Sequence, residues 1–195
     1  MRLGIDFDNT LADFGGLLRA ITLERTGVDF RAIRAANPDV ADIEALCYAA
    51  VGRERFDALS AEIVLADHST RIESRPGAIE VMRRLGARHE IVLLTARSEA
   101  ESVTPRRWLE HHGLRVAGFV TTATGPKATH AIEHSLAAHL DDSVAVFEAF
   151  DDAHPTVPVL MAHPMNAAHP RAAHWRSVED WLAFERLVET LERER

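Results

Sequence analysis

The chain has 195 residues, of which 47% are hydrophobic and 27% charged, and its formal net charge is −8. This length and apolar fraction suit one globular core, or one domain that carries a sizeable insertion. The negative charge argues against a polymeric nucleic acid as partner, because non-specific binding to a polyanion depends on clustered Lys and Arg side chains.

The single cysteine, Cys47, cannot form an internal disulfide, and its apolar neighbours predict a buried side chain. The first residues lack the basic start and apolar core of an export signal. No apolar run approaches the length needed to cross a bilayer. We therefore expect a soluble cytoplasmic protein whose partner is neither a membrane nor a nucleic acid polymer.

The first predicted strand is the short apolar run Leu3–Ile5, and two acidic residues, Asp6 and Asp8, follow it directly. In an extended segment, residues two apart point the same way, so the two carboxylates are expected to share one face. Like charges held together need a cation or a shared proton to compensate them. The rest of the chain is expected to supply that partner.

Residues 15–71 have the spacing of apolar residues that is typical of helices, and no convincing strand interrupts them. Breaks are predicted at Gly27, at Asn37-Pro38 and at Gly52. We expect three or four helices packed as a small module inserted after the first strand.

From residue 76 onward, the pattern predicts helices and strands that alternate. Pro76 is expected at the first position of one helix, and Thr104 and Pro105 as the N-cap and first residue of another. The predicted strands are 90–94, 116–121, 136–140 and 157–161, and the predicted helices are 76–86, 104–112, 125–134, 144–150 and 177–191. Parallel neighbours need crossover connections, so this alternation predicts an α/β fold with a Rossmann-like, three-layer core and a parallel sheet.

Polar side chains follow several of these strands, and in such sheets ligands bind beyond the carboxyl ends of the strands. The residues placed at that edge are Asp6, Asp8, Thr95, Asp141 and Asp142, with Lys127 opening a helix beside them. Clustered carboxylates suit Mg²⁺, which is commonly held by one or two carboxylates together with waters and a substrate phosphate. The predicted substrate is therefore a phosphate ester.

The same residue types fit the chemistry of phosphoryl transfer. A carboxylate can attack phosphorus and give an aspartyl-phosphate, which divides one difficult displacement into two easier steps. Asp8 could protonate the leaving oxygen and then take a proton from water. Thr95 could donate a hydrogen bond to a transferring oxygen, and Lys127 could offset the negative charge.

In their order along the chain, these residues resemble the four motifs of the haloacid dehalogenase superfamily of aspartate-nucleophile phosphohydrolases. The resemblance implies that Asp6 is nucleophile and metal ligand, and that Asp8 is acid/base and gives the metal its backbone carbonyl. It implies that Thr95 and Lys127 complete the catalytic set. It also implies a core of residues 1–14 and 72–195 and a C1-type helical cap of residues 15–71.

Two acidic residues close the series, and the resemblance makes both of them candidates for binding Mg²⁺. Asp142 is favoured as the direct ligand, and Asp141 as a second ligand or as a neighbour of the ligands. Spacing alone leaves these two alternatives open.

A narrower similarity concerns Leu11-Ala12-Asp13-Phe14, which resembles the segment after the nucleophile in 5′(3′)-deoxyribonucleotidases; Asn9-Thr10 departs from that branch. Phe14 could stack on a nucleoside base or anchor the first helix of the cap. Arg97 could reach the substrate or pair with Glu99. The expected substrate-binding residues are Thr95, Ala96, Arg97, Lys127 and Phe14.

The function predicted here is a Mg²⁺-dependent phosphomonoester hydrolase acting on a small soluble phosphorylated metabolite, with a nucleotide as one candidate. The alternatives are a phosphotransferase of the same superfamily, a phospho-accepting module of the receiver type, and an inactive member that only binds a phosphorylated ligand. A histidine-rich segment near the C-terminus matches no usual zinc spacing, and we interpret it as a loop with incidental histidines: His154, His163, His169 and His174.

Overall fold

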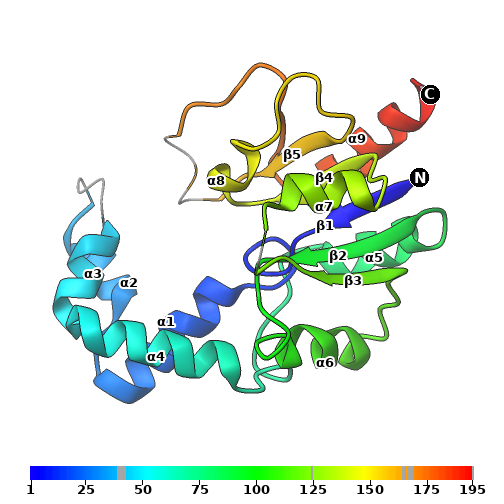
Figure 1. The fold of residues 1–195 in the computed structure, drawn as a ribbon. Coiled ribbons are helices and arrows are strands. Elements are labelled where there is room, and N and C mark those ends of the chain that lie inside the picture. Colours follow the sequence, from blue (N-terminus) through cyan, green and yellow to red (C-terminus); the bar gives the residue numbers. More distant parts are fainter. Residues whose placement is uncertain (39–42, 124, 164–165, 167–168, 195) are drawn as a thin grey trace.

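The computed structural model describes residues 1–38, 43–123, 125–163, 166 and 169–194. Its centre is a six-stranded sheet in which every pair of neighbouring strands is parallel (Figure 1). The order across the sheet is β3-β2-β1-β4-β5-β6. The strands are β1 (Arg2–Ile5), β2 (Glu90–Thr95), β3 (Gly118–Thr121), β4 (Ala138–Asp141), β5 (Val157–Met161) and β6 (Arg176–Val178). The predicted α/β class is confirmed.

Helices cover both faces of the sheet, because alternate residues of each strand point to opposite sides. Ile91 and Leu93 of β2 belong to a large apolar cluster with helices α5 (Ala78–Gly86), α6 (Val103–His111) and α9 (Trp181–Arg193). Val92 and Leu94 belong to a second cluster with α7 (Lys127–Glu133) and α8 (Val144–Phe147). The apolar runs read from the sequence are thus strands buried on both faces, as parallel sheets require.

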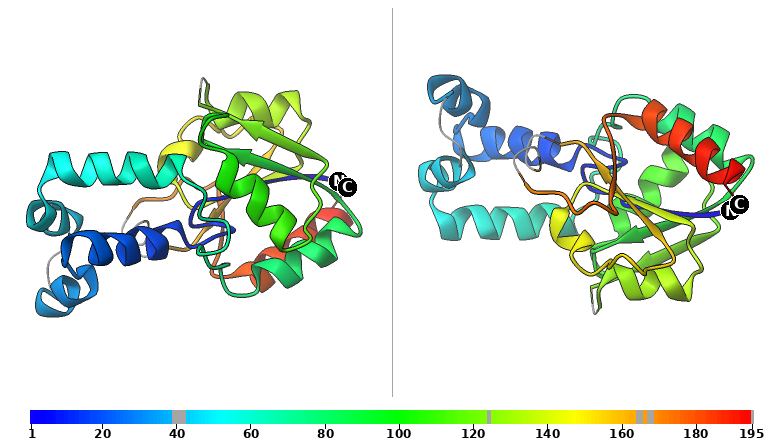
Figure 2. Two further views of the ribbon diagram at one scale, coloured as in Figure 1. Left: turned by 90° about the horizontal axis from the view of Figure 1, so that it is seen from below. Right: turned by 90° about the horizontal axis from the view of Figure 1, so that it is seen from above.

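In the described part of the chain between β1 and α5 there are four helices: α1 (Phe14–Thr26), α2 (Phe30–Ala36), α3 (Ile43–Val51) and α4 (Arg53–Leu65). They stand to one side of the sheet, and α1 and α4 form the two connections to it (Figures 1 and 2). The predicted breaks agree with the observed ends: Gly27 (φ 75°) closes α1, Asn37 closes α2 and Gly52 (φ 89°) precedes α4. Both glycines have the left-handed φ that side chains disfavour. Cys47, in α3, is buried as predicted.

Several predicted boundaries are wrong. Helix α6 begins at Val103, and Ser102 is its N-cap. Thr104 is therefore not the N-cap, and Pro105 is the third residue of the helix instead of the first. The Thr104 hydroxyl instead donates to the Ala66 carbonyl and accepts from the His68 N–H, both at 2.8 Å, so it fastens the chain that leaves α4. This tertiary partner competes for a hydroxyl that would otherwise cap the helix locally.

Two other helix starts also differ from the prediction. Pro76 lies in a turn, and α5 begins two residues later, after Gly77 in the left-handed region (φ 76°). The segment predicted as a closing helix from residue 177 contains the edge strand β6, and α9 begins only at Trp181. Asp180 caps α9 by accepting the Ala183 N–H at 2.7 Å. A three-residue edge strand carries too little periodicity to be recognised in sequence.

None of the helices in the described ranges has both the length and the apolar character that a membrane crossing requires.

Candidate active site

The candidate site lies where the carboxyl ends of the three central strands meet. The central strand β1 has β2 on one side and β4 on the other, so the chain after β1 lies between the ends of both neighbours. The Asp6 N–H donates to the Leu140 carbonyl at 2.9 Å and continues this ladder. Between β1 and β4 the strand order changes direction, and ligands of open α/β sheets bind at such a switch point.

Three acidic side chains converge at this edge. Asp6, Asp141 and Asp142 each offer one carboxylate oxygen, and these oxygens all lie within 4.8 Å of one another. Asp6 and Asp141 are buried, whereas Asp142 is partly exposed. Among the residues that the structure describes, this is the one group of His, Cys, Asp and Glu side chains suited to hold a metal ion.

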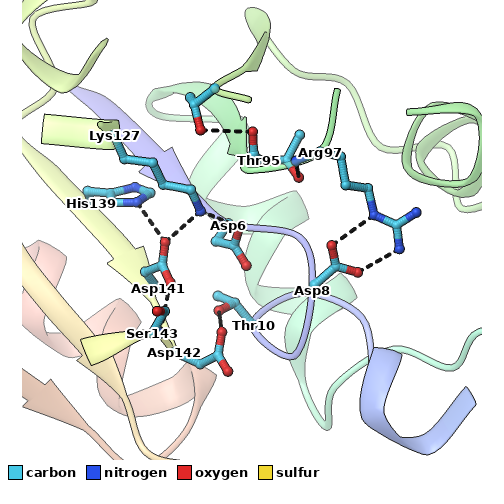
Figure 3. A network of polar contacts seen from close by, with 11 residues as sticks. Asp6, Asp8, Thr10, Thr95, Arg97, Lys127, His139, Asp141, Asp142 and Ser143 are labelled. Atoms are coloured by element: carbon cyan, nitrogen blue, oxygen red, sulfur yellow. Dashed lines mark hydrogen bonds and ion pairs between the residues drawn. The ribbon is translucent and has the colours of Figure 1, made fainter. Parts of the chain in front are cut away.

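Lys127 is the cation of this cluster and the only lysine of the chain. It begins α7, and its ammonium donates to Asp6 Oδ1 at 2.6 Å and to Asp141 Oδ2 at 2.7 Å (Figure 3). The side chain is buried. Burial alone would lower the pKa of Lys127, but the carboxylates of Asp141 and Asp6 outweigh it and raise that pKa above its usual value. Lys127 is therefore a fixed positive charge in the site.

The acidic groups of the cluster outnumber its one ammonium, so a further cation or bound protons must balance the charge. Burial raises the pKa of Asp6 well above its usual value, and the Lys127 ammonium only partly offsets this. Burial and the Asp141 charge raise the pKa of Asp142 to about 7. Three carboxylates thus face one ammonium. An oxygen-rich cluster with excess negative charge fits a hard divalent cation such as Mg²⁺.

Asp141 is held by more donors than either of the other two acids. It accepts hydrogen bonds from Lys127 and from the Ser143 N–H, and His139 Nε2 lies 3.1 Å from its Oδ2. These contacts oppose the effect of burial and keep the pKa of Asp141 below its usual range, with the Lys127 charge as the largest favourable contribution. His139 was missed in the sequence, although it precedes Asp141 by two residues and therefore shares its face of the strand.

Asp142 is positioned through its backbone and its side chain. Its carbonyl accepts a 2.8 Å hydrogen bond from the Asn166 side-chain amide, which also donates to the Met161 carbonyl at 2.8 Å. The Thr10 hydroxyl lies 3.5 Å from Asp142 Oδ1. Asn166 was not predicted to be a site residue, because nothing in the sequence marks a loop asparagine as the anchor of a strand end 24 residues earlier.

Asp8 is separate from the acidic cluster. Its carboxylate faces Arg97, which donates to it through Nε and Nη2 at 2.8 Å each, and it points away from Asp6 and Asp142 (Figure 3). Of the two alternatives that the sequence left open for Arg97, pairing with Glu99 is not observed, because Glu99 contacts Arg106 instead. The two acids after β1 thus occupy different surroundings, although their spacing led us to expect one shared face.

The loop that carries Asp8 has a locally determined shape. Asn9 adopts a left-handed conformation (φ 57°), and its side-chain oxygen accepts the Gly15 N–H at 2.8 Å. Asp13 caps α1 by accepting the Gly16 N–H at 2.9 Å. A Cβ atom at Gly16 would lie 2.2 Å from Asp13 Oδ2, so this cap requires glycine there. These short contacts explain why α1 begins directly after the loop, at the sequence Asp13-Phe14-Gly15-Gly16.

The remaining predicted binding residues surround this loop. Thr95 ends β2 and is buried, and its hydroxyl accepts the Arg97 N–H at 3.3 Å. Ala96 follows it and is exposed. Phe14 is the first residue of α1, packs partly buried against the core, and lies 5.1 Å from the Arg97 guanidinium. This packing favours the anchoring interpretation of Phe14.

The histidine-rich segment does not form a metal site among the described residues. His154 Nε2 lies 3.2 Å from the Ala128 carbonyl, and His174 Nε2 lies 2.7 Å from the Phe150 carbonyl. Each of these two ring nitrogens thus lies within hydrogen-bond distance of a backbone carbonyl.

Comparison with known proteins identifies the fold. No family model and no curated protein matches the chain. Solved structures do match, among them a provisionally named phosphoglycolate phosphatase from Lactobacillus plantarum, with a TM-score of 0.58, 18% identity and coverage of 95% of this chain and 98% of that one. The chain has the fold of the haloacid dehalogenase superfamily.

Two further matches cover nearly the whole of both chains. A haloacid dehalogenase-superfamily hydrolase from Bacillus subtilis, bound to magnesium, has a TM-score of 0.57 and 13% identity over 97% of each chain. An L-2-haloacid dehalogenase has a TM-score of 0.58 and 14% identity over 96% of this chain and 98% of that one. The resemblance read from the motifs is thus confirmed for the fold.

Proposed function

We propose that this protein is a Mg²⁺-dependent phosphomonoesterase that acts on a small soluble phosphorylated metabolite through an aspartyl-phosphate on Asp6. The observation that carries the proposal is a group of four side chains at the carboxyl end of the central strand. The group consists of Asp6, Asp141, Asp142 and Lys127. A buried carboxylate beside a fixed ammonium and a divalent-cation site is the arrangement that an attack on a phosphoryl group requires.

The proposed reaction has two steps, and each step is assigned to residues of the site. An Asp6 oxygen attacks phosphorus, the ester P–O bond breaks, and the leaving oxygen takes a proton from Asp8. Water then attacks phosphorus, Asp8 accepts its proton, and the bond from phosphorus to Asp6 breaks to release inorganic phosphate. Lys127 neutralises charge on Asp6 and on the phosphoryl oxygens, and Thr95 is assigned the hydrogen bond to one of those oxygens.

Mg²⁺ would be held by Asp6, Asp142 and the backbone carbonyl of Asp8, with Asp141 beside them. Mg²⁺ bound there supplies electrostatic stabilisation of the phosphoryl charge. Asp142 is preferred to Asp141 as direct ligand, because Asp141 already accepts hydrogen bonds from Lys127 and Ser143. The carboxylate of Asp141 is thus less available to bind a metal ion than the carboxylate of Asp142.

Residues 15–71 are proposed to form the cap, and residues 1–14 and 72–195 the core. The four helices adjoin the site through both connections, and a cap there can exclude water and select the leaving group. Deletion of the insert in a protein that still folds should change the order of substrate preference; an unchanged order would contradict the cap assignment.

The strand order argues against the receiver alternative. Receivers have the flavodoxin-like order 2-1-3-4-5, whereas this sheet has the order 3-2-1-4-5-6. Hydrolysis of a carbon–halogen bond is a second alternative function, because one of the matching solved structures is named as a haloacid dehalogenase. A halide leaves without a proton, so that chemistry would give Asp8 no role as an acid.

The decisive experiment is a screen for phosphate release with nucleotides, sugar phosphates and other small phosphoesters, run with Mg²⁺ and with EDTA. Asp6→Asn and Asp8→Asn are run beside the wild type, and halide release from haloacids is measured in parallel. We expect phosphate release that Mg²⁺ supports and that both substitutions abolish. An Asp6→Asn protein as active as wild type would exclude the mechanism, and transfer of phosphate to an acceptor instead of water would identify a phosphotransferase.

A further inference from the structure

The inference concerns Arg97, a buried arginine outside the acidic cluster. Its side chain is 5% exposed, so its charge must be satisfied by the protein. The guanidinium donates to both oxygens of Asp8 at 2.8 Å, in the bidentate geometry that binds a carboxylate most firmly. An aspartate side chain has two rotatable bonds, and a two-point contact restrains both of them. Arg97 therefore determines where the Asp8 carboxylate lies.

The same guanidinium also holds the second connection of the insert. Its Nη1 donates to the carbonyl of Val64, at the C-terminal end of α4, and to the carbonyl of Glu101, both at 3.1 Å. The last carbonyls of a helix have no partner within the helix and lie at its negative end, so a buried cation is stabilised there. The guanidinium also lies over the ring of Phe14, at the start of α1. Arg97 thus joins Asp8 to both ends of the insert that reach the core.

We propose that Arg97 is a positioning residue that orients Asp8 toward the leaving group and makes this orientation depend on how α4 is seated. The proposal rests on the proposed phosphatase function. A general acid must lie within hydrogen-bond reach of the atom that it protonates. With its Nε, Nη1 and Nη2 groups engaged by Asp8 and two carbonyls, Arg97 acts through Asp8 rather than by binding the phosphoryl group.

The leaving group provides a direct test of this role. A nitrophenolate leaves without the help of an acid, whereas an alkoxide needs a proton as the P–O bond breaks. The value of kcat/KM reports the steps up to the departure of the leaving group. Misplacing Asp8 should therefore lower kcat/KM for an alkyl phosphate and spare an aryl phosphate. A general loss of folding or of phosphoryl binding would lower both values equally.

The experiment compares Arg97→Gln and Arg97→Lys with wild type, using glycerol phosphate and p-nitrophenyl phosphate as substrates. For Arg97→Gln we expect kcat/KM to fall about 100-fold with glycerol phosphate, the lower range of a general acid's contribution, and less than about fivefold with p-nitrophenyl phosphate. Arg97→Lys keeps the charge without the two-point contact, so we expect about a tenfold loss with glycerol phosphate. The inhibition constant of inorganic phosphate should stay within about twofold of wild type.

Arg107→Gln is the matched control. Arg107 lies in α6 and pairs with Asp67 in the chain that leaves α4, at 2.6 Å, so its loss loosens that connection without removing the Asp8 partner. We expect equal, small changes with both substrates. Thermal unfolding of each variant identifies any that do not fold; if Arg97→Gln does not, Arg97→Lys carries the comparison.

Equal losses of kcat/KM with both substrates in a folded Arg97 variant would overturn the proposal, as would a tenfold or greater rise in the inhibition constant of phosphate. The latter result would make Arg97 a phosphoryl-binding residue. A wild type that releases no phosphate from any ester would instead overturn the proposed function, and this assignment with it. The two failures are therefore distinguishable.

Discussion

Replacing Lys127 by methionine tests the electrostatic account of the site most directly. The substitution keeps a long unbranched side chain and removes the ammonium that contacts Asp6 and Asp141 at 2.6 and 2.7 Å. No other lysine exists in the chain to complicate the interpretation. The change leaves Asp6, Asp141 and Asp142 within 4.8 Å of one another with no cation from Lys127.

The expected loss of stability is large because both partner carboxylates are buried. Breaking a buried ion pair by removing one partner typically costs about 3–5 kcal/mol, since the remaining charge is left uncompensated. A bound cation should recover part of this: a ligand at 100 times its dissociation constant stabilises the folded state by about 2.7 kcal/mol. Mg²⁺ should therefore reduce the difference in unfolding free energy between Lys127→Met and wild type.

The assay is urea unfolding followed by circular dichroism, with EDTA and with Mg²⁺. Arg53→Met is the control, because Arg53 forms an exposed ion pair with Asp57 and its loss should cost less than about 1 kcal/mol. A Lys127→Met protein within about 1 kcal/mol of wild type in EDTA would refute the charge balance described here. So would a variant that Mg²⁺ stabilises no more than it stabilises wild type.

Three other outcomes follow from the contacts. Since the folded-state pKa of Lys127 is raised, its contribution is fully present below about pH 10.4 and lost as pH rises further, so alkaline unfolding curves of wild type and Lys127→Met should converge. Thr104→Val should lower the free energy of unfolding in urea by about 1–3 kcal/mol and speed amide exchange in residues 66–68. Thr104→Ser keeps the hydroxyl and should have neither effect. Equal exchange rates in the two variants would contradict the proposed role of the hydroxyl. Trp181 is buried and its Nε1 donates to the Thr10 carbonyl at 2.9 Å, so Trp181→Phe should lower the unfolding free energy by about 1–3 kcal/mol, and an unchanged midpoint would count against it.

Much of the fold is readable from local pattern. The apolar runs that predict β1, β2, β4 and β5 are strands buried on both faces, and their positions depend on burial rather than on any one partner. Glycine adopts a positive φ without the steric cost that other residues meet, so Gly27 and Gly52 could be predicted as breaks between helices. Residues after parallel strands share one edge of the sheet, which is why Asp6, Asp141 and Lys127 could be predicted to meet.

The sequence by itself therefore determined five of the six strands, the helical insert and the grouping of Asp6, Asp141 and Asp142 with Lys127. Only the tertiary structure decided that Asp8 faces Arg97, 89 residues away, and that Thr104 holds residues 66–68 instead of capping α6. Local propensity and periodicity involve residues within one or two turns of each other. A buried polar group takes whichever partner the packed chain brings within reach, because leaving it unpaired costs more than any local preference supplies.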